Sequence, residues 1–253
     1  EIARSALEQA IDTFNKIGDN RHAFESMITL AIGVYARTGQ IVQSKQLADE
    51  LLDRSRVDGD DQARLWALTW LLWCAGSTNE AEPRVNDWLQ ELDSVTNLEL
   101  PDVDKFFAYG VMAKSAFSGG ELHHAERYAD LAEAILARSA QTGHYLIASF
   151  DSLSEYYWQA LVEQKTDAVT DTKKRLKRLG AKLNQLSFVY PVAKPSVYLA
   201  RGRYSDVAGK EERAIVHWGK ALNSAVEFGM PHEAEKLTAL LRSRSSARVS
   251  APE

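Results

Sequence analysis

The residues in this sequence that could bind a metal ion or act as a base form two short clusters. His123 and His124 are adjacent, with Glu121 and Glu126 close by. Adjacent side chains on a helix point about 100° apart, so these two imidazoles share a metal ion poorly. The second cluster, Asp-Gly-Asp-Asp at 58–61, predicts a loop and a helix cap, because a metal site there needs carboxylates from elsewhere. We therefore predict no metal site.

Sequence motifs for catalysis and nucleotide binding are absent from the chain. No HExxH, CxxC, EF-hand loop or phosphate-binding glycine loop occurs, and no serine lies in a nucleophile elbow. The single cysteine, Cys74, excludes a disulfide framework and is expected to be a small packing residue. We predict neither a cofactor nor an enzyme. A helical enzyme with a small-molecule site stays an alternative, and it requires a carboxylate or histidine with a strongly shifted pKa.

Charge and hydropathy narrow the classes of partner. The chain has 30 Lys and Arg against 35 Asp and Glu, and this net charge of −5 argues against a general nucleic-acid binder. The longest apolar stretch, 65–75, is far shorter than the ~20 residues that cross a membrane. We expect a cytoplasmic protein that contacts neither nucleic acid nor membrane. The start at Glu1, without methionine, predicts an excised piece of a longer chain.

A basic run at 173–182 alternates with Leu176, Leu179 and Leu183 at helical spacing. It predicts a helix whose basic side chains face solvent, and docking of an acidic partner stays an alternative.

Tryptophans at i, i+4 and i+7 form the most distinctive pattern in the chain. Trp66, Trp70 and Trp73 lie beside an apolar stripe at 65, 68 and 72. Two interpretations stay open at this point. Either the rings fill space between packed helices, or they form an aromatic surface that binds a ligand.

The elements that position these residues are predicted to be helices. Apolar residues recur three and four positions apart, glycine and proline number only 14 and 6, and long alternating runs typical of strands are missing. The sequence therefore predicts an all-α fold.

One helical pattern recurs along the chain. It consists of a small residue, a larger residue four positions later and a small residue three positions after that, as in Ala214, Trp218 and Ala221. Copies begin at residues 3, 44, 81, 125, 169 and 214, separated by 37 to 45 residues. A second helix with its own apolar stripe precedes most copies, at 28–35, 65–72, 109–116, 153–160 and 198–205. Each pair forms a hairpin that must bury its stripes against the next hairpin.

The small and aromatic residues of this pattern resemble those of the tetratricopeptide repeat. They are Tyr198, Gly202, Gly209, Ala214, Trp218 and Ala221, and likewise Tyr35, Gly39, Ala48 and Leu51. The closing run from Tyr198 to Pro231 is similar to the long tetratricopeptide-type repeats at the C-terminal ends of large bacterial signalling ATPases, among them maltose-activator-like and LuxR-type regulators and cyclase-linked or kinase-linked ATPases. The sequence departs from the family in its spacing, which exceeds the usual ~34 residues, and in Arg201, which stands where the repeat prefers an apolar residue.

The resemblance covers nearly the whole chain and implies a right-handed α-α superhelix, a solenoid of about five helical hairpins plus a leading half-repeat. The first helix of each hairpin then lines a concave groove, and residues beside its core stripe face a ligand. The implied ligand-binding residues are Arg37, Trp66, Trp70, Trp73, Phe107, Lys114, Phe117, Trp158 and Arg203. Aromatic rings flanked by basic side chains suit a protein or peptide segment.

We expect a non-catalytic protein- or peptide-binding module, a scaffold or sensor within a larger signalling or transcription-regulatory protein. Its partner would be a protein segment, a peptide or another domain of the same parent chain. The alternatives are a receptor for a short signalling peptide or small molecule, and a self-associating spacer in which a homodimer covers the tryptophans. We expect one solenoid domain at 1–242 and a flexible C-terminal tail, rich in serine and arginine, at 243–253.

Overall fold

A computed structural model describes residues 1–78, 81–138 and 142–249, without the side chains of 245–249. Most of these residues lie in helices, and no strand occurs among them, so the predicted all-α class is confirmed. The α-helices are α1 (Ile2–Ile17), α2 (Asn20–Leu30), α3 (Ile41–Asp58), α4 (Asp61–Ala75), α5 (Val85–Thr96), α6 (Asp102–Ser118), α7 (Leu122–Arg138), α8 (Leu146–Val162), α9 (Val169–Val189), α10 (Lys194–Val207), α11 (Glu211–Glu227) and α12 (Pro231–Val249). A π-helix at Ala31–Ala36 continues α2, and a 3-10 helix at Pro191–Ala193 precedes α10.

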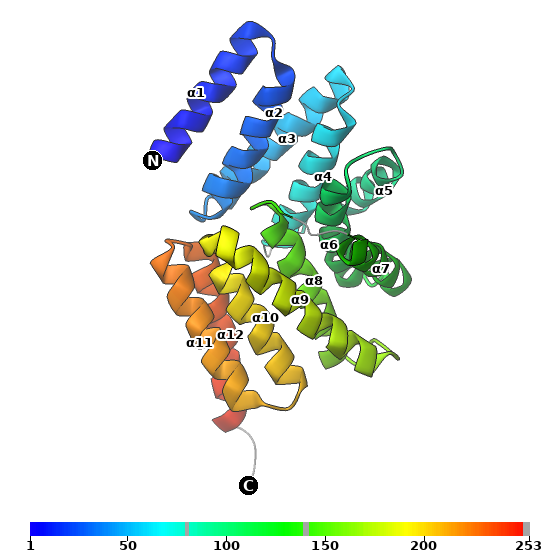
Figure 1. Cartoon of the computed structure of the whole chain (residues 1–253), viewed down its shortest axis with the longest axis vertical. Helices are drawn as coiled ribbons and strands as arrows, with labels where there is room; N and C mark the ends of the chain where they lie inside the picture. The colour runs from blue at the N-terminus through cyan, green and yellow to red at the C-terminus, as the bar shows by residue number, and fades with distance from the viewer. Residues whose placement is uncertain (79–80, 139–141, 250–253) are drawn as a thin grey trace. The chain divides into compact units, whose positions relative to one another are not determined.

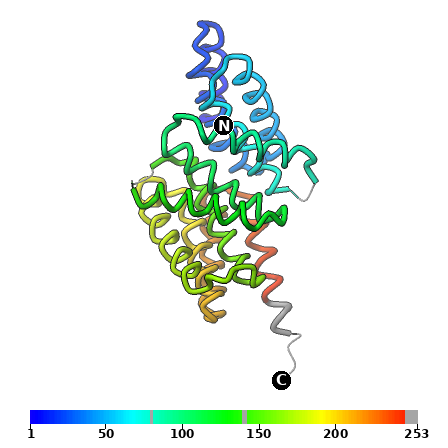
Figure 2. Tube along the Cα trace, turned by 90° about the vertical axis from the view of Figure 1, so that its right-hand side faces the viewer, coloured from blue at the N-terminus to red at the C-terminus, as the bar shows by residue number. Residues whose placement is uncertain are grey.

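Helices pack mostly against neighbours in the sequence, as α1 with α2, α6 with α7 and α10 with α11 do (Figure 1). The Cα trace passes from one helix to the next through turns (Figure 2). The small-residue pattern falls on α1, α3, α7, α9 and α11, and the copy that begins at residue 81 starts before α5 and continues into it. The preceding stripes fall on α2 with the π-helix that continues it and on α4, α6, α8 and α10, which we call the first helices. This sequential packing is consistent with a helical repeat. The sequence did not predict α12 as a further helix.

Two aspartates and two glycines show how the helix ends are specified. The carboxylate of Asp19 accepts a hydrogen bond from the backbone of His22 at the start of α2, and that of Asp60 accepts one from Ala63 at the start of α4. Asp60 is therefore the helix cap that the acidic run predicts. Gly18 and Gly59 end α1 and α3 with positive φ, which glycine adopts without a steric cost.

The small residues of the repeat pattern lie where helices approach closely. Ala48, Ala125 and Ala214 have no exposed surface. Within the last hairpin, a Cβ atom on Gly202 of α10 would overlap the indole of Trp218 on α11, which is also fully buried. In α1, by contrast, no residue is fully buried.

The described residues group into two compact units, each with its own internal packing. Unit 1 comprises Glu1–Ala36 and Gln40–Leu153, and unit 2 comprises Arg37–Gly39 and Ser154–Glu253, so the division falls within α8. The segment from Ser243 that the sequence predicts as a flexible tail begins as helix, because α12 extends to Val249. Among the described residues, none of the helices combines the length and apolar character that a bilayer crossing needs.

Candidate functional site

Unit 1 contains a pocket of about 300 Å³ that is lined by first helices. Its walls come from α2, α4, α6 and the turn that precedes α8. Ile28, Val103 and Phe107 supply apolar wall, and Trp66 adds an aromatic ring. The first helices α2, α4 and α6 and the turn before α8 thus contribute one wall each.

Four polar residues, one from each wall, form a row through this pocket. Arg21 Nη2 donates to Gln62 Oε1 at 2.8 Å, and Gln62 Nε2 donates to Asp104 Oδ2 at 2.6 Å. The hydroxyl of Tyr145 donates to Asp104 Oδ1 at 3.4 Å. The separations along the chain are 41, 42 and 41 residues, so these residues occupy matching places in successive hairpins. We call Arg21, Gln62, Asp104 and Tyr145 the polar ladder.

Asp104 is the most buried carboxylate of this site, with 1% of its surface exposed. Trp66 Nε1 donates to its Oδ1 atom at 2.7 Å, which ties α4 to α6. Burial raises the pKa of the Asp104 carboxyl above its ordinary value, and the hydrogen bonds from Trp66 and Gln62 oppose this rise. The site therefore holds a carboxylate whose charge is only partly compensated.

Arg21 contributes the positive charge at the pocket. Its guanidinium carbon lies 4.7 Å from the ring centroid of Trp66, within the range of a cation–π interaction. Arg21 also pairs with Glu25 at 3.1 Å and with Asp60 at 3.3 Å. The guanidinium is thus held in place by α2, by the start of α4 and by the indole.

The tryptophan stripe divides between the pocket and the core. Trp66 lines the pocket and is 8% exposed. Trp70 is 2% exposed, and its Nε1 atom donates to Ser44 Oγ at 2.7 Å, so it lies in the packed interior of unit 1 rather than on an open face. Trp73 is partly exposed, and its ring stacks on that of Trp70 with centroids 4.3 Å apart. The three rings therefore do not form one open aromatic surface, because helical packing covers the middle one.

The three predicted residues on α6 also differ in position. Phe107 is fully buried and lines the pocket. Phe117 is 5% exposed at the far end of the helix, and Lys114 Nζ lies 3.5 Å from the carbonyl oxygen of Gly76 after α4. Of these three, only Phe107 shares the pocket with Trp66. Ligand binding by all three stays a prediction.

The remaining predicted residues belong to unit 2. Trp158 Nε1 donates to Asp206 Oδ2 at 2.7 Å, and the guanidinium of Arg203, 6% exposed, lies 5.9 Å from the Trp158 ring centroid. Arg203 also bonds Ser154 and pairs with Glu155 at 3.1 Å. Arg203 is thus buried within this unit, and ligand binding by Arg203 and Trp158 stays a prediction.

Arg37 lies apart from that cluster. Its Nη1 atom is 3.9 Å from Met230 Sδ. Of the candidate residues, Trp66 and Phe107 therefore line the pocket of unit 1, Trp158 and Arg203 form a cluster within unit 2, and the others lie at neither place.

The sequence analysis missed the polar ladder. Arg21, Gln62, Asp104 and Tyr145 differ in type, so no shared residue marks them as a group. Their common signal is position, since the first three lie at the start of α2, α4 and α6. A search for polar residues that recur at the repeat spacing could have found them.

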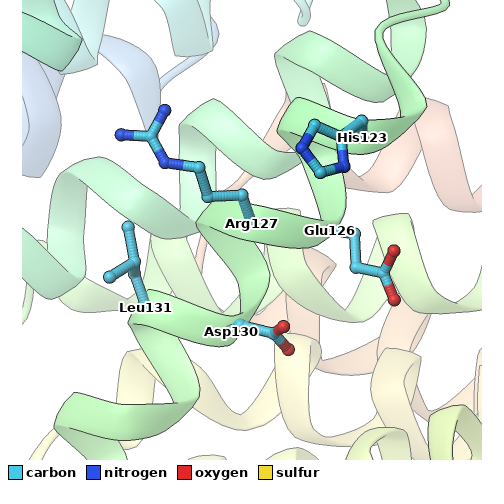
Figure 3. A pocket seen from close by; sticks show the side chains of 5 residues that line it. All are labelled: His123, Glu126, Arg127, Asp130 and Leu131. Atoms are coloured by element: carbon cyan, nitrogen blue, oxygen red, sulfur yellow. The ribbon is translucent and has the colours of Figure 1, made fainter.

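A second hollow lies on α7, where one helix supplies every lining residue (Figure 3). His123, Glu126, Arg127, Asp130 and Leu131 follow each other at helical spacing. Because one helix face cannot surround a ligand, this hollow is a weaker candidate than the pocket of unit 1.

The described residues contain no group of three or more histidine, cysteine or acidic side chains arranged to hold a metal ion. Cys74 is buried, as expected for a packing residue. Comparison with known proteins adds no relative to this geometry: no family model, no curated protein and no solved structure matches the chain.

Proposed function

We propose that the chain is a right-handed tetratricopeptide-like solenoid whose first-helix face binds a protein or peptide segment. It acts as a non-catalytic scaffold or sensor module of a larger cytoplasmic signalling or transcription-regulatory protein. The observation that carries this proposal is the pocket of unit 1, to which α2, α4, α6 and the turn before α8 each contribute a residue of the polar ladder, while α2, α4 and α6 supply its apolar and aromatic wall.

The composition of the pocket suits a side chain of a bound peptide. Ile28, Val103 and Phe107 offer apolar contact, while the polar ladder offers hydrogen-bonding groups. Pockets that combine a mainly apolar lining with a few convergent polar groups are the usual form of a binding site. A volume of about 300 Å³ accommodates one side chain rather than a folded domain.

Peptide selection followed by matched substitutions tests this function. Peptides selected from a random library on the immobilised protein are measured by fluorescence anisotropy against the wild type, Val103→Glu and Val57→Glu. Val103 lines the pocket, whereas Val57 is 86% exposed on α3 in the same unit. We expect at least tenfold weaker binding to Val103→Glu and unchanged binding to Val57→Glu. Failure to select any peptide, or equal affinities for all three proteins, contradicts the proposal.

An enzyme with a small-molecule site is the second candidate, because a carboxyl with a raised pKa, Asp104, lines the pocket. Both oxygens of Asp104 already accept hydrogen bonds from Trp66 and Gln62. A carboxylate held in this way is better placed to attract a ligand than to remove a proton from one, so binding is the better supported function.

A further inference from the structure

The pocket of unit 1 contains a carboxylate that forms no ion pair with a basic group of the described residues, although the charge of Arg21 acts on it from a greater distance. Asp104 accepts hydrogen bonds from Trp66, Gln62 and Tyr145, and no basic group of the described residues lies within ion-pair distance of it. An ionised carboxylate that is buried without a cation is costly, and a cation that arrives with a ligand offsets this cost. The site therefore favours a positively charged ligand group over a neutral one of the same shape.

Unit 2 contains a hydrogen-bonded tryptophan–aspartate pair of the same kind, and there an arginine pairs with the aspartate. Trp158 donates to Asp206 at 2.7 Å, the distance found between Trp66 and Asp104. In unit 2, however, Arg244 Nη2 lies 2.8 Å from Asp206 Oδ2, and its guanidinium carbon lies 5.9 Å from the Trp158 ring centroid. An arginine of the chain itself thus neutralises the carboxylate and lies near the indole.

The charged groups around the pocket of unit 1 carry an excess of negative charge, which favours the binding of a second cation. Arg21 is already paired with Glu25 and Asp60, and Asp104 adds a third carboxylate. One guanidinium therefore faces three carboxylates, a formal excess of two negative charges when His144 is neutral. Trp158 lies near two arginines, Arg203 and Arg244, whereas within the described part of the chain Arg21 is the arginine that lies over Trp66.

We propose that the bound protein or peptide segment inserts a basic side chain, in the first instance arginine, into this pocket. Its charged end pairs with Asp104, and its methylene stem lies against Val103 and Phe107, which line the same pocket. The inference rests on the proposed function, because it names the contact residue that the partner brings to the same site.

Three matched tripeptides test the charge requirement. They are N-acetyl-Ala-X-Ala-amide with arginine, citrulline or leucine at X, and citrulline keeps the shape of arginine without its charge. Binding is followed through the indole N–H resonance of Trp66, which is assigned by its loss in Trp66→Phe. We expect the arginine peptide to bind at least tenfold more tightly than the citrulline peptide, because a charge-assisted bond is about twice as strong as a neutral one.

Two variants assign the effect to Asp104. Asp104→Asn is expected to abolish the preference for arginine over citrulline. Asp53→Asn removes a carboxylate of α3 whose side chain is 81% exposed, and we expect it to keep the preference. If Asp104→Asn does not fold, the comparison of arginine with citrulline in the wild type still decides the question.

The outcomes separate this inference from the proposed function. Equal affinity for the arginine and citrulline peptides, or stronger binding of the leucine peptide, contradicts the insertion of a basic side chain. The proposal that the pocket binds a peptide is unaffected by either result. The same holds if none of the tripeptides shifts the Trp66 resonance while library-selected peptides bind at Val103. If neither tripeptides nor selected peptides bind, both proposals fail.

Discussion

Units 1 and 2 contain the same hydrogen-bonded pair in different surroundings. In each unit a tryptophan on one first helix donates its indole N–H to an aspartate on the next first helix, Trp66 to Asp104 and Trp158 to Asp206. In unit 2 Arg244 forms an ion pair with the aspartate, Asp206. In unit 1 the carboxylate forms no ion pair among the described residues, and Arg21 reaches it only through Gln62.

This difference lies in the charge beside the bond. In unit 2 the aspartate is paired with an arginine of α12, and Asp206 and Arg244 together line a hollow of about 280 Å³. In unit 1 no arginine of the described residues forms an ion pair with the aspartate, and Trp66 and Asp104 line a pocket of about 300 Å³. The tryptophan–aspartate bond is therefore common to both units, and the neighbouring helix decides whether the aspartate is neutralised within the chain.

Glycine substitutions give the largest contrast between the two units. We expect Gly202→Ala to lower the free energy of unfolding by about 1–3 kcal/mol, because the new Cβ overlaps the buried Trp218 indole. Gly33→Ala is the matched change on the α2 side of unit 1, where the nearest atom, His144 Nε2, would be 3.7 Å from the Cβ. It is expected to be neutral or stabilising by up to ~1 kcal/mol. Urea unfolding followed by circular dichroism measures both. Equal losses would mean that unit 1 is packed as tightly there as unit 2.

Removing the two carboxylates tests the next largest contrast. Asp206→Asn leaves Arg244 without its ion-pair partner, so we expect a loss of about 1–3 kcal/mol in unfolding free energy. Asp104→Asn removes a charge that has no such partner, but its amide NH2 replaces an oxygen that accepts from Trp66 or Gln62, so we expect a loss of about 1 kcal/mol. Thermal and urea unfolding of the two variants beside the wild type measure the difference. A larger loss for Asp104→Asn would show that its carboxylate is already compensated, which would break the comparison.

Acid should affect the two units in opposite directions. Burial, with a smaller contribution from Lys236, lowers the pKa of His232 in unit 2 to about 4. As pH falls from 6.5 towards 4, the unfolded state therefore takes up a proton that the folded state does not, and stability is lost. Burial raises the pKa of Asp104 in unit 1 above its ordinary 3.8, so as pH falls from that raised pKa to 3.8 the folded state binds the proton before the unfolded state does, and stability rises.

Unfolding free energies of the wild type, His232→Gln and Asp104→Asn between pH 7 and pH 3.5 check both signs. On acidification the stability of the wild type relative to His232→Gln should fall, and its stability relative to Asp104→Asn should rise. Parallel curves for all three proteins would contradict the assignment of these groups.

The smallest effect is expected on α7, outside both tryptophan–aspartate pairs. His123 is exposed on the one-helix hollow, so His123→Ala should change the unfolding free energy by no more than ~0.5 kcal/mol. Its affinity for pocket-binding peptides, measured by anisotropy, should match that of the wild type. A tenfold loss of peptide affinity would indicate that the binding site lies on α7 rather than on the first helices.

Much of the fold could be predicted because helical spacing is a local property of the sequence. The stripes at 65–72 and 198–205 fall within α4 and α10, and the buried Ala48 and Ala125 mark close helix contacts as expected. The site was harder to predict. The same spacing describes Trp66 at the pocket and Trp70 in the interior, and only the position of the neighbouring helices separates them.

Contacts between distant residues of different type leave little trace in one sequence. The polar ladder joins arginine, glutamine, aspartate and tyrosine, so no residue type recurs at its positions to reveal it. Arg37 meets Met230 across 193 residues, and Arg244 meets Asp206 from a helix that the repeat pattern did not include.

The polar ladder also bears on how unit 1 unfolds. In a stack of repeats, cooperativity depends on the interfaces between adjacent hairpins, because each hairpin touches only its neighbours. Opening one hairpin of unit 1 would strip Gln62 or Asp104 of hydrogen-bond partners, so a boundary between folded and unfolded hairpins is costly there. The backbone amides of α2, α4 and α6 should therefore exchange their hydrogens with solvent as one cooperative group.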